Sequence, residues 1–153
     1  MLEDAAYVKQ TEQGTIEMLL ALAMIVSLQP DDVQPNCSGN TLEINACLGE
    51  KRDRSEKRLQ NYVRAAIDRH IDQDGKSDSV ALGIQASQTA FEAYRAIECA
   101  AVYERWKEGT IRGAMGSSCA TELTDQRTRT VWENWLRYMD STPPILPEPK
   151  PTE

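Results

Sequence analysis

Apolar residues recur at helical spacing in three long segments of the chain, and no segment shows the alternating pattern of a strand. The first segment begins after Pro35, where Asn40 or Thr41 is a candidate helix cap and Glu43 or Ile44 falls in the first turn. Its apolar positions are Leu48, Leu59, Val63, Ala66, Ile67 and Ile71. Despite a strongly charged middle, this spacing predicts one long helix over roughly residues 41–71.

The stretch DQDGKSD, residues 72–78, interrupts the helical pattern. Aligning Gly75 with the glycine of a calcium-binding EF-hand loop puts Ala81 where that loop requires a bidentate glutamate. We therefore interpret the stretch as a polar turn. A second helix is predicted over about residues 79–107. Its inward positions would be Val80, Ile84, Ser87, Phe91, Tyr94, Ile97 and Ala101.

Three glycines and two serines in GTIRGAMGSS predict a loop over residues 109–118. A third helix is predicted over about 119–140, with Leu123, Val131, Trp135, Leu136 and Met139 facing inward. Five prolines in STPPILPEPKPTE predict a flexible or polyproline-like tail over residues 142–153. The fold class is therefore all-α: an antiparallel bundle of three main helices, with an extra N-terminal helix as an alternative for the first 35 residues.

Residues 1–35 form a separate N-terminal segment, ahead of a helical domain at 36–141. Its apolar run MLLALAMIVSL, residues 18–28, is too short to span a bilayer and suits the apolar region of a signal peptide or anchor. The acidic flank before the run argues against this interpretation unless translation starts at Met18. The alternative is an amphipathic helix that packs on the domain.

The net charge of −7 makes nucleic acid or an anionic membrane surface an unfavourable main partner, since phosphate binding needs a basic face. Membrane contact is expected only through an uncleaved N-terminal segment. A basic protein partner is electrostatically favoured. Basic residues concentrate between Lys51 and Arg69 but alternate there with acidic ones, which is typical of a solvated helix face.

The sequence offers no catalytic centre, and we predict neither an enzyme nor a bound metal or cofactor. His70 is the only imidazole, it lies at a helix end, and no nucleophile motif surrounds it. Phosphate-binding glycine motifs are absent. Of the three tryptophans, we expect Trp106 and Trp135 in the core and consider Trp132 the best candidate for an exposed one. The spacing of Cys37, Cys47, Cys99 and Cys119 does not fit a zinc module, and four cysteines allow three disulfide pairings.

Motifs along the chain resemble the LprI-like lysozyme-inhibitor family of small secreted bacterial domains. The run QTAFEAYRAIEC resembles the family's Q-x-x-W-x-x-[FY]-R-x-x-E-C, with phenylalanine in place of tryptophan. CSGNTLEINAC resembles the family's opening, with Glu43 displaced by one, and CATELTDQRT resembles its C-x-x-x-L-T-x-x-R-T. The residues that carry the resemblance are Asn45, Leu59, Gln88, Phe91, Tyr94, Arg95, Glu98, Leu123, Thr124 and Arg127, together with the cysteines.

The resemblance implies oxidised cysteines, and we expect the pairs Cys37–Cys47 and Cys99–Cys119. The second pair would close the glycine-rich loop, in which Arg112, Ser117 and Ser118 are candidate partner-binding residues. We interpret Arg95 and Arg127 as structural ties, with Glu92 or Glu98 as a local ion partner of Arg95.

By the same resemblance, the function would be that of a periplasmic or secreted domain that binds a lysozyme or another basic envelope protein and blocks a cationic lysozyme by steric occlusion. The alternative is an envelope adaptor or structural protein that binds another periplasmic component or peptidoglycan without inhibiting lysozyme.

Overall fold

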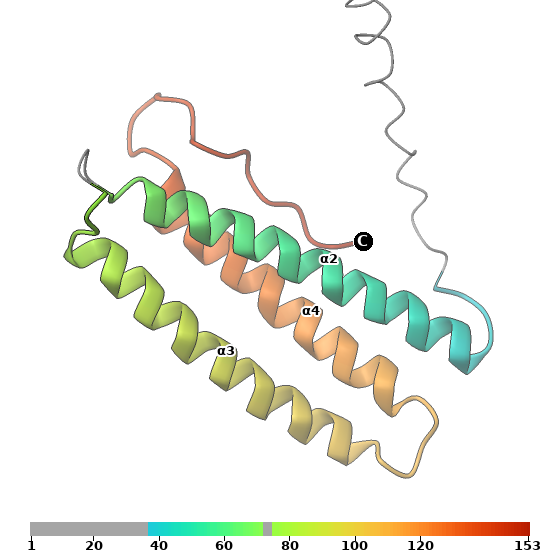
Figure 1. Ribbon diagram of the computed structural model, residues 1–153. Coiled ribbons are helices and arrows are strands. Elements are labelled where there is room, and N and C mark those ends of the chain that lie inside the picture. The colour runs from blue at the N-terminus through green and yellow to red at the C-terminus, as the bar shows by residue number, and fades with distance from the viewer. Residues whose placement is uncertain (1–36, 72–74) are drawn as a thin grey trace, which may run out of the picture. The chain divides into compact units, whose positions relative to one another are not determined.

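The computed structural model describes residues 37–71 and 75–153, and the signal-peptide, anchor and extra-helix interpretations of the first 35 residues lie outside this part. Three helices, α2 (Thr41–Asp68), α3 (Ser79–Arg105) and α4 (Arg112–Val131), lie side by side and alternate in direction along the chain (Figure 1). The described residues contain no strand beyond an isolated bridge between Ile71 and Ser77. The predicted all-α antiparallel bundle is confirmed. Within the same ranges, no helix is both long and apolar enough to cross a bilayer.

Capping side chains fix the starts of α2 and α3. Asn40 accepts hydrogen bonds from the backbone N–H groups of Leu42 and Glu43, and the Glu43 carboxylate accepts one from the Asn40 N–H at 3.0 Å. This reciprocal pair is a capping box, which satisfies N–H groups that have no partner inside the helix. The Asp78 side chain caps α3, accepting from the N–H groups of Val80 and Ala81, both at 2.8 Å. Both starts agree with the sequence prediction.

The apolar core lies at one end of the bundle, where the end of α2, the start of α3 and the end of α4 meet. Its buried members are Leu59, Tyr62, Val63, Ala66, Ile84, Val131, Trp132 and Leu136. At the opposite end, the buried apolar residues are small, namely Cys47, Ala114 and Ala120, and a disulfide joins α3 to α4. We call these two regions the core end and the disulfide end.

The predicted inward face of the second helix is wrong over its second half. Tyr94 and Ile97 are 52% and 73% exposed, whereas Gln88, Phe91 and Arg95 face the other helices. The physical reason is that alanines and other uncharged residues occupy most of α3 all round, so apolar periodicity does not single out one face.

The third helix begins seven residues earlier than predicted and ends differently. Residues 112–118 are helical, which leaves only 106–111 as the connection from α3. After Val131 the chain forms a wider turn of π-helix, η1 (Trp132–Leu136), in which Trp132 and Leu136 are both buried. Met139, predicted to face inward, lies beyond the helix and is 96% exposed.

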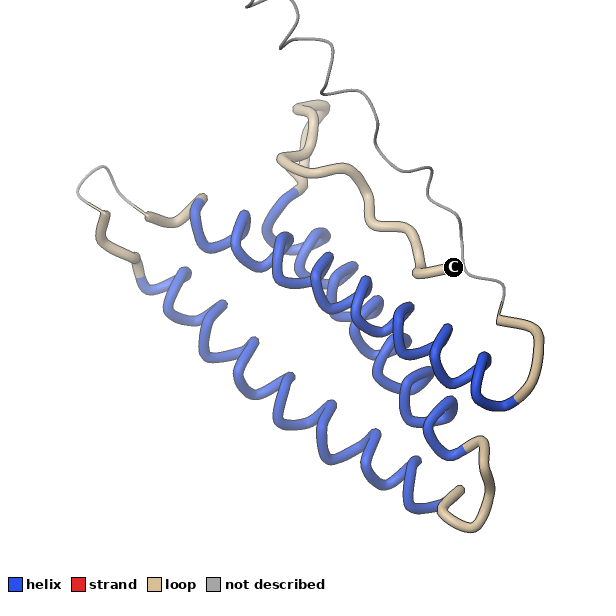
Figure 2. Tube along the Cα trace, turned by 45° about the vertical axis from the view of Figure 1, so that its right-hand side comes forward, coloured by secondary structure: helices blue, strands red, loops and turns tan. Residues whose placement is uncertain are grey.

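The proline-rich tail is not the free end that its composition predicts. It turns back after η1 and runs along α2 and α4, as both views show (Figure 1, Figure 2). Ile145 N–H donates to the Leu136 carbonyl at 2.8 Å, and Pro149 is buried. The tail forms no helix or strand, as predicted, but side chains of the bundle hold it in place.

Candidate functional site

The two motif arginines both contact the ring of Phe91. Each guanidinium carbon is 5.7 Å from the centre of the phenylalanine ring, a distance typical of a cation–π contact. Arg95 also donates to the Thr124 hydroxyl at 2.7 Å and pairs with the Glu56 carboxylate at 3.3 Å. One side chain of α3 thereby ties together all three helices.

Arg127 makes the corresponding tie from α4 to α3. It donates to the Gln88 amide oxygen at 3.2 Å and to the Ser87 hydroxyl at 2.7 Å. Burial lowers the pKa of Arg127 below its usual value, because its neighbours there are neutral groups. The interpretation of both arginines as structural ties agrees with these contacts.

The expected local ion pair of Arg95 is wrong. Its carboxylate partner is Glu56 of α2, whereas Glu92 accepts a hydrogen bond from Gln88 and Glu98 is exposed on the outside of α3. The sequence contains the helical spacing but does not reveal which neighbouring helix faces an arginine. Among the other motif residues, Leu59 and Thr124 are buried and Leu123 is half-buried.

Both expected disulfides are present. The Cα atoms are 5.4 Å apart in Cys37–Cys47 and 5.6 Å apart in Cys99–Cys119, within the usual range for the bond. Because Cys119 lies inside α4, the second disulfide joins one helix directly to another instead of closing a loop that ends at the cysteine. It therefore fixes the distance between α3, after which the 106–111 turn begins, and α4, before which the turn ends.

The Arg112 side chain holds this turn with three hydrogen bonds. Its guanidinium donates to the carbonyls of Lys107 and Gly109, both at 3.2 Å, and its Nε donates to the Tyr103 hydroxyl at 2.9 Å. These bonds satisfy acceptors of the end of α3 and of the turn, and α4 itself has no side-chain cap at its start. The candidate binding residue Arg112 therefore organises the turn by its own contacts.

Helix α2 holds the same turn from the other side. The Asn45 amide donates to the Thr110 carbonyl at 3.3 Å. A Cβ on Gly113 would lie only 3.2 Å from the Asn45 side-chain oxygen, so glycine allows the two helices to approach here. Asn45 and Gly113 thus belong to a contact between α2 and α4. The turn is therefore held by residues of all three helices.

Three large side chains around the turn, Tyr103, Trp106 and Ile111, are each about 40% exposed. We call these three residues and Arg112 the turn surface. Trp106 was expected in the core and Trp132 outside it, but the structure reverses them, since Trp132 is only 8% exposed. The signal in the sequence was the position of Trp106 directly before a glycine-containing turn.

The other two loop candidates, Ser117 and Ser118, lie within α4 and are half-buried. Ser117 lines a surface pocket of about 490 Å³ beside Arg95 and Cys99, and Ser118 lines one of about 360 Å³ beside Tyr94 and Glu98. These shallow pockets flank the α3–α4 disulfide. The prediction that the serines lie on an exposed loop with Arg112 is therefore wrong.

In the described ranges, no group of three or more histidine, cysteine, aspartate or glutamate side chains could hold a metal ion. His70 lies at the turn between α2 and α3, where its Nδ1 is 3.0 Å from the Asp78 carboxylate. That distance shows a polar contact that links the end of one helix to the cap of the next.

Comparison with known proteins gives one family match. A model described as "Lysozyme inhibitor LprI" matches residues 34–131, more than half of the chain. No curated protein and no solved structure matches the chain. The matched residues include both disulfides, the arginine ties and the turn surface, and they end where α4 gives way to η1. The chain belongs to the LprI lysozyme inhibitor family.

Proposed function

We propose that this protein is a secreted or periplasmic domain that binds a cationic lysozyme and inhibits it by steric occlusion of its cleft. Family membership is the observation that carries the proposal. The two disulfides support an oxidising compartment, because such bonds persist outside the reducing cytosol. Inhibition by occlusion needs a rigid protruding surface and no catalytic group on the inhibitor.

The turn surface is the binding site we propose. Tryptophan, tyrosine and arginine are the residues most often responsible for binding energy at protein interfaces, and all three occur here. The hydrogen bonds from Arg112 and Asn45 and the nearby disulfide order the turn before any partner arrives. An ordered turn loses less conformational entropy on binding, which favours affinity.

Long-range attraction between the bundle and a cationic enzyme should be modest. Six of the 24 acidic residues and one of the 17 basic residues fall within residues 1–36, so residues 37–153 carry a formal charge of only −2. Much of the chain's acidity therefore lies outside the bundle. We expect short-range contacts of the turn surface to contribute most of the affinity and salt to weaken inhibition only slightly.

Lysozyme turnover measured with excess purified protein at several salt concentrations tests the proposal. We expect inhibition at low salt, and replacement of Trp106 by alanine should raise the concentration needed for half-inhibition about tenfold or more. Met139→Ala is the matched control, since this exposed side chain lies at the core end. Absence of inhibition by the unchanged protein at low salt would contradict the proposed function. Equal inhibition by Trp106→Ala would instead exclude the turn surface as the site.

A second function, that of an envelope adaptor, is favoured by the outer face of α3. Tyr94 and Ile97, which are three residues apart in α3, are both more than half exposed, and neighbouring exposed apolar side chains are candidates for a protein contact. The test is capture of envelope proteins by the unchanged chain and by Ile97→Asp. Loss of a captured protein with the variant, combined with full lysozyme inhibition, would support this second role. Equal capture by both chains would argue against it.

A further inference from the structure

Aromatic side chains of the bundle donate hydrogen bonds to successive carbonyls of the tail. The indole Nε1 of Trp132 donates to the Leu146 carbonyl at 2.9 Å, and the Tyr62 hydroxyl donates to the Pro147 carbonyl at 2.8 Å. Extended proline-containing chains make no internal hydrogen bonds, so their carbonyls are free to accept. Aromatic-lined grooves bind proline-rich peptides by using this property.

The contacts continue to the end of the tail. Pro149 is buried, and Glu148 forms an ion pair with Arg129 at 2.8 Å. The Asp125 carboxylate accepts from the Thr152 N–H at 2.6 Å and from its hydroxyl at 2.9 Å. Arg58 reaches both Asp125 and the Thr152 hydroxyl. The bundle thus makes separate contacts with the carbonyls, a proline ring, a carboxylate and a hydroxyl of the tail.

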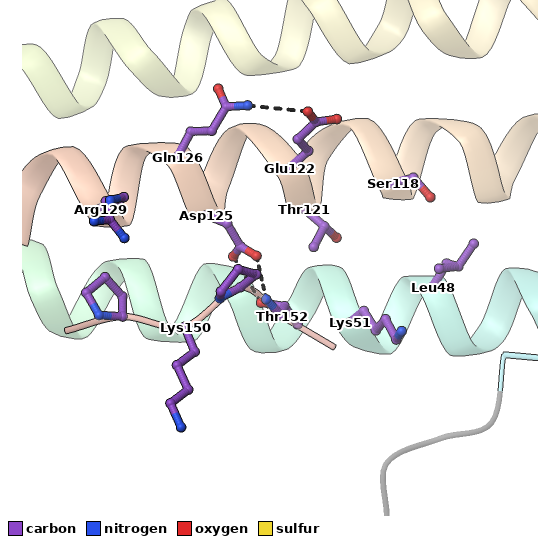
Figure 3. A pocket seen from close by; sticks show the side chains of 12 residues that line it. Leu48, Lys51, Ser118, Thr121, Glu122, Asp125, Gln126, Arg129, Lys150 and Thr152 are labelled. Atoms are coloured by element: carbon purple, nitrogen blue, oxygen red, sulfur yellow. Dashed lines mark hydrogen bonds between the residues drawn. The ribbon is translucent and has the colours of Figure 1, made fainter. Parts of the chain in front are cut away.

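The groove continues past Thr152. A pocket of about 460 Å³ borders the last tail residues and continues between α2 and α4 to Leu48, Lys51 and Ser118 (Figure 3). In the close view, these three side chains lie on the far side of Thr152 from Lys150. The helices therefore offer a surface beside Thr152 as well as along the earlier tail residues.

We propose that the groove formed by Arg58, Tyr62, Asp125, Arg129 and Trp132 is a binding site for extended, proline-containing polypeptide segments, and that residues 145–153 are its built-in, displaceable occupant. The exchanging partner is a segment of another protein with the chemistry of the tail: free carbonyls beside proline, an acidic residue and a hydroxyl. The groove lies along α2 and α4, whereas the turn surface joins α3 to α4, so this inference does not rest on the lysozyme proposal.

Two features make the tail displaceable. No disulfide links it to the bundle, because the four cysteines pair among themselves at residues 37–119. Beside the packing of Leu146 and Pro149, its contacts are separate hydrogen bonds and a largely exposed ion pair, which are individually weak. Burial raises the pKa of Tyr62 above its usual value, although nearby Arg58 acts in the opposite direction, so its hydroxyl remains a donor. Tethering gives the tail a millimolar effective concentration, which a competing segment must overcome.

The test cleaves the tail after folding, because Leu146 packs against the core and a chain made without it would lack that packing as it folds. A protease site inserted between the exposed residues Thr142 and Pro143 allows the folded full chain to be cut and the released fragment to be exchanged. The probe is a fluorescent synthetic peptide of residues 143–153, followed by anisotropy. We expect it to bind the cut chain at least tenfold more tightly than the uncut chain, which the tethered tail blocks.

Tyr62→Phe in the cut chain should weaken peptide binding about fivefold, since it removes only the donor to Pro147. Tyr138→Phe is the control, because this tyrosine is exposed and outside the groove. Two outcomes would overturn the proposal: a cut chain that stays helical by circular dichroism but does not bind the peptide, and a cut chain that unfolds when the fragment leaves. Dimers of the uncut chain that separate on cutting would overturn the choice of another protein and identify the tail of a second copy as the exchanging segment.

Discussion

At the residue scale, the pairing of Arg95 and Arg127 around Phe91 explains why the motif combines charge with an aromatic ring. Each guanidinium lies among helices that exclude much of the water, where an unpaired charge would be costly. Both guanidinium groups contact the phenylalanine ring and donate to neutral hydroxyl or amide oxygens. Glu56 is the one carboxylate of this junction, and it pairs with Arg95. The motif therefore marks a helix junction more than a contact surface.

Replacing Arg95 by alanine should destabilise this junction. The change leaves the buried Thr124 hydroxyl without this donor and removes the closer of the two arginines paired with Glu56, so we expect the free energy of unfolding to fall by about 2–3 kcal/mol. Arg95→Lys should recover part of this loss, because lysine keeps the charge but not the forked geometry. Urea denaturation measures both, with exposed Arg105→Ala as the control. A loss no larger than that of the control would contradict the proposed tie.

At the scale of the elements, helix caps determine where α2 and α3 begin, and their chemistry makes part of the stability pH-dependent. The pKa of Asp78 is lowered, first by the hydrogen bond from the Ala81 N–H and further by His70 and Val80. A carboxyl group with a lower pKa in the folded state stabilises the fold above its ordinary pKa. That contribution is lost as the pH falls through the lowered value.

Asp78→Asn isolates this effect, because asparagine caps a helix about as well but does not titrate. Between pH 6 and pH 2, the unfolding temperature of the unchanged protein should fall more than that of the variant. Thermal unfolding by circular dichroism makes the comparison at each pH. Parallel curves for the two proteins over this range would show that the cap carboxylate does not contribute to acid sensitivity.

At the scale of the whole bundle, two different forces hold its two ends. The core end buries large apolar side chains, while the disulfide end has only small buried residues and relies on the Cys99–Cys119 bond and the Arg112 and Asn45 contacts. In the chain-entropy model, a disulfide with a sequence separation of 20 residues contributes about 3 kcal/mol. The disulfide end should therefore depend strongly on oxidation.

Replacing Cys99 and Cys119 together by serine should destabilise the disulfide end more than the core end. We expect amide hydrogen exchange to accelerate in the last turns of α3, in the 106–111 turn and in the first turns of α4, with little change around Val63 and Val131. Unfolding stability should fall by about 3 kcal/mol. Uniform acceleration along all helices would mean that the bundle unfolds as a single unit and that the division into two ends is wrong.

Local chemistry accounts for the parts of this fold that the sequence predicts. Asn40, Glu43 and Asp78 act on N–H groups two or three residues away, so the helix starts could be read directly. Gly113 could not, because it looks like a helix breaker until Asn45 is known to approach it. The tail was misjudged for the same reason, since its hydrogen-bond donors, Tyr62 among them, lie far away in the sequence.

The candidate site also contains some features that the sequence predicts and others that depend on contacts distant in the sequence. The disulfide pairs followed from the family resemblance, and the arginine ties followed from charges among apolar positions. The turn surface was only partly predicted, because the exposure of Trp106 depends on where α4 begins. Arg112 was identified as a binding candidate, but its role as an organiser of the turn required the positions of the Lys107 and Gly109 carbonyls.

The π-helical turn at Trp132–Leu136 has a consequence for how the chain can change over evolution. A π-turn closes a hydrogen bond over five residues instead of four, as the Arg137 N–H does with the Trp132 carbonyl, and so holds one residue more than an α-helical turn. That extra residue lets Trp132 and Leu136 both reach the core before the tail departs. Segment length is therefore the constraint here: we expect substitution of the exposed Asn134 to have little effect, whereas deleting it would rotate every later side chain out of register.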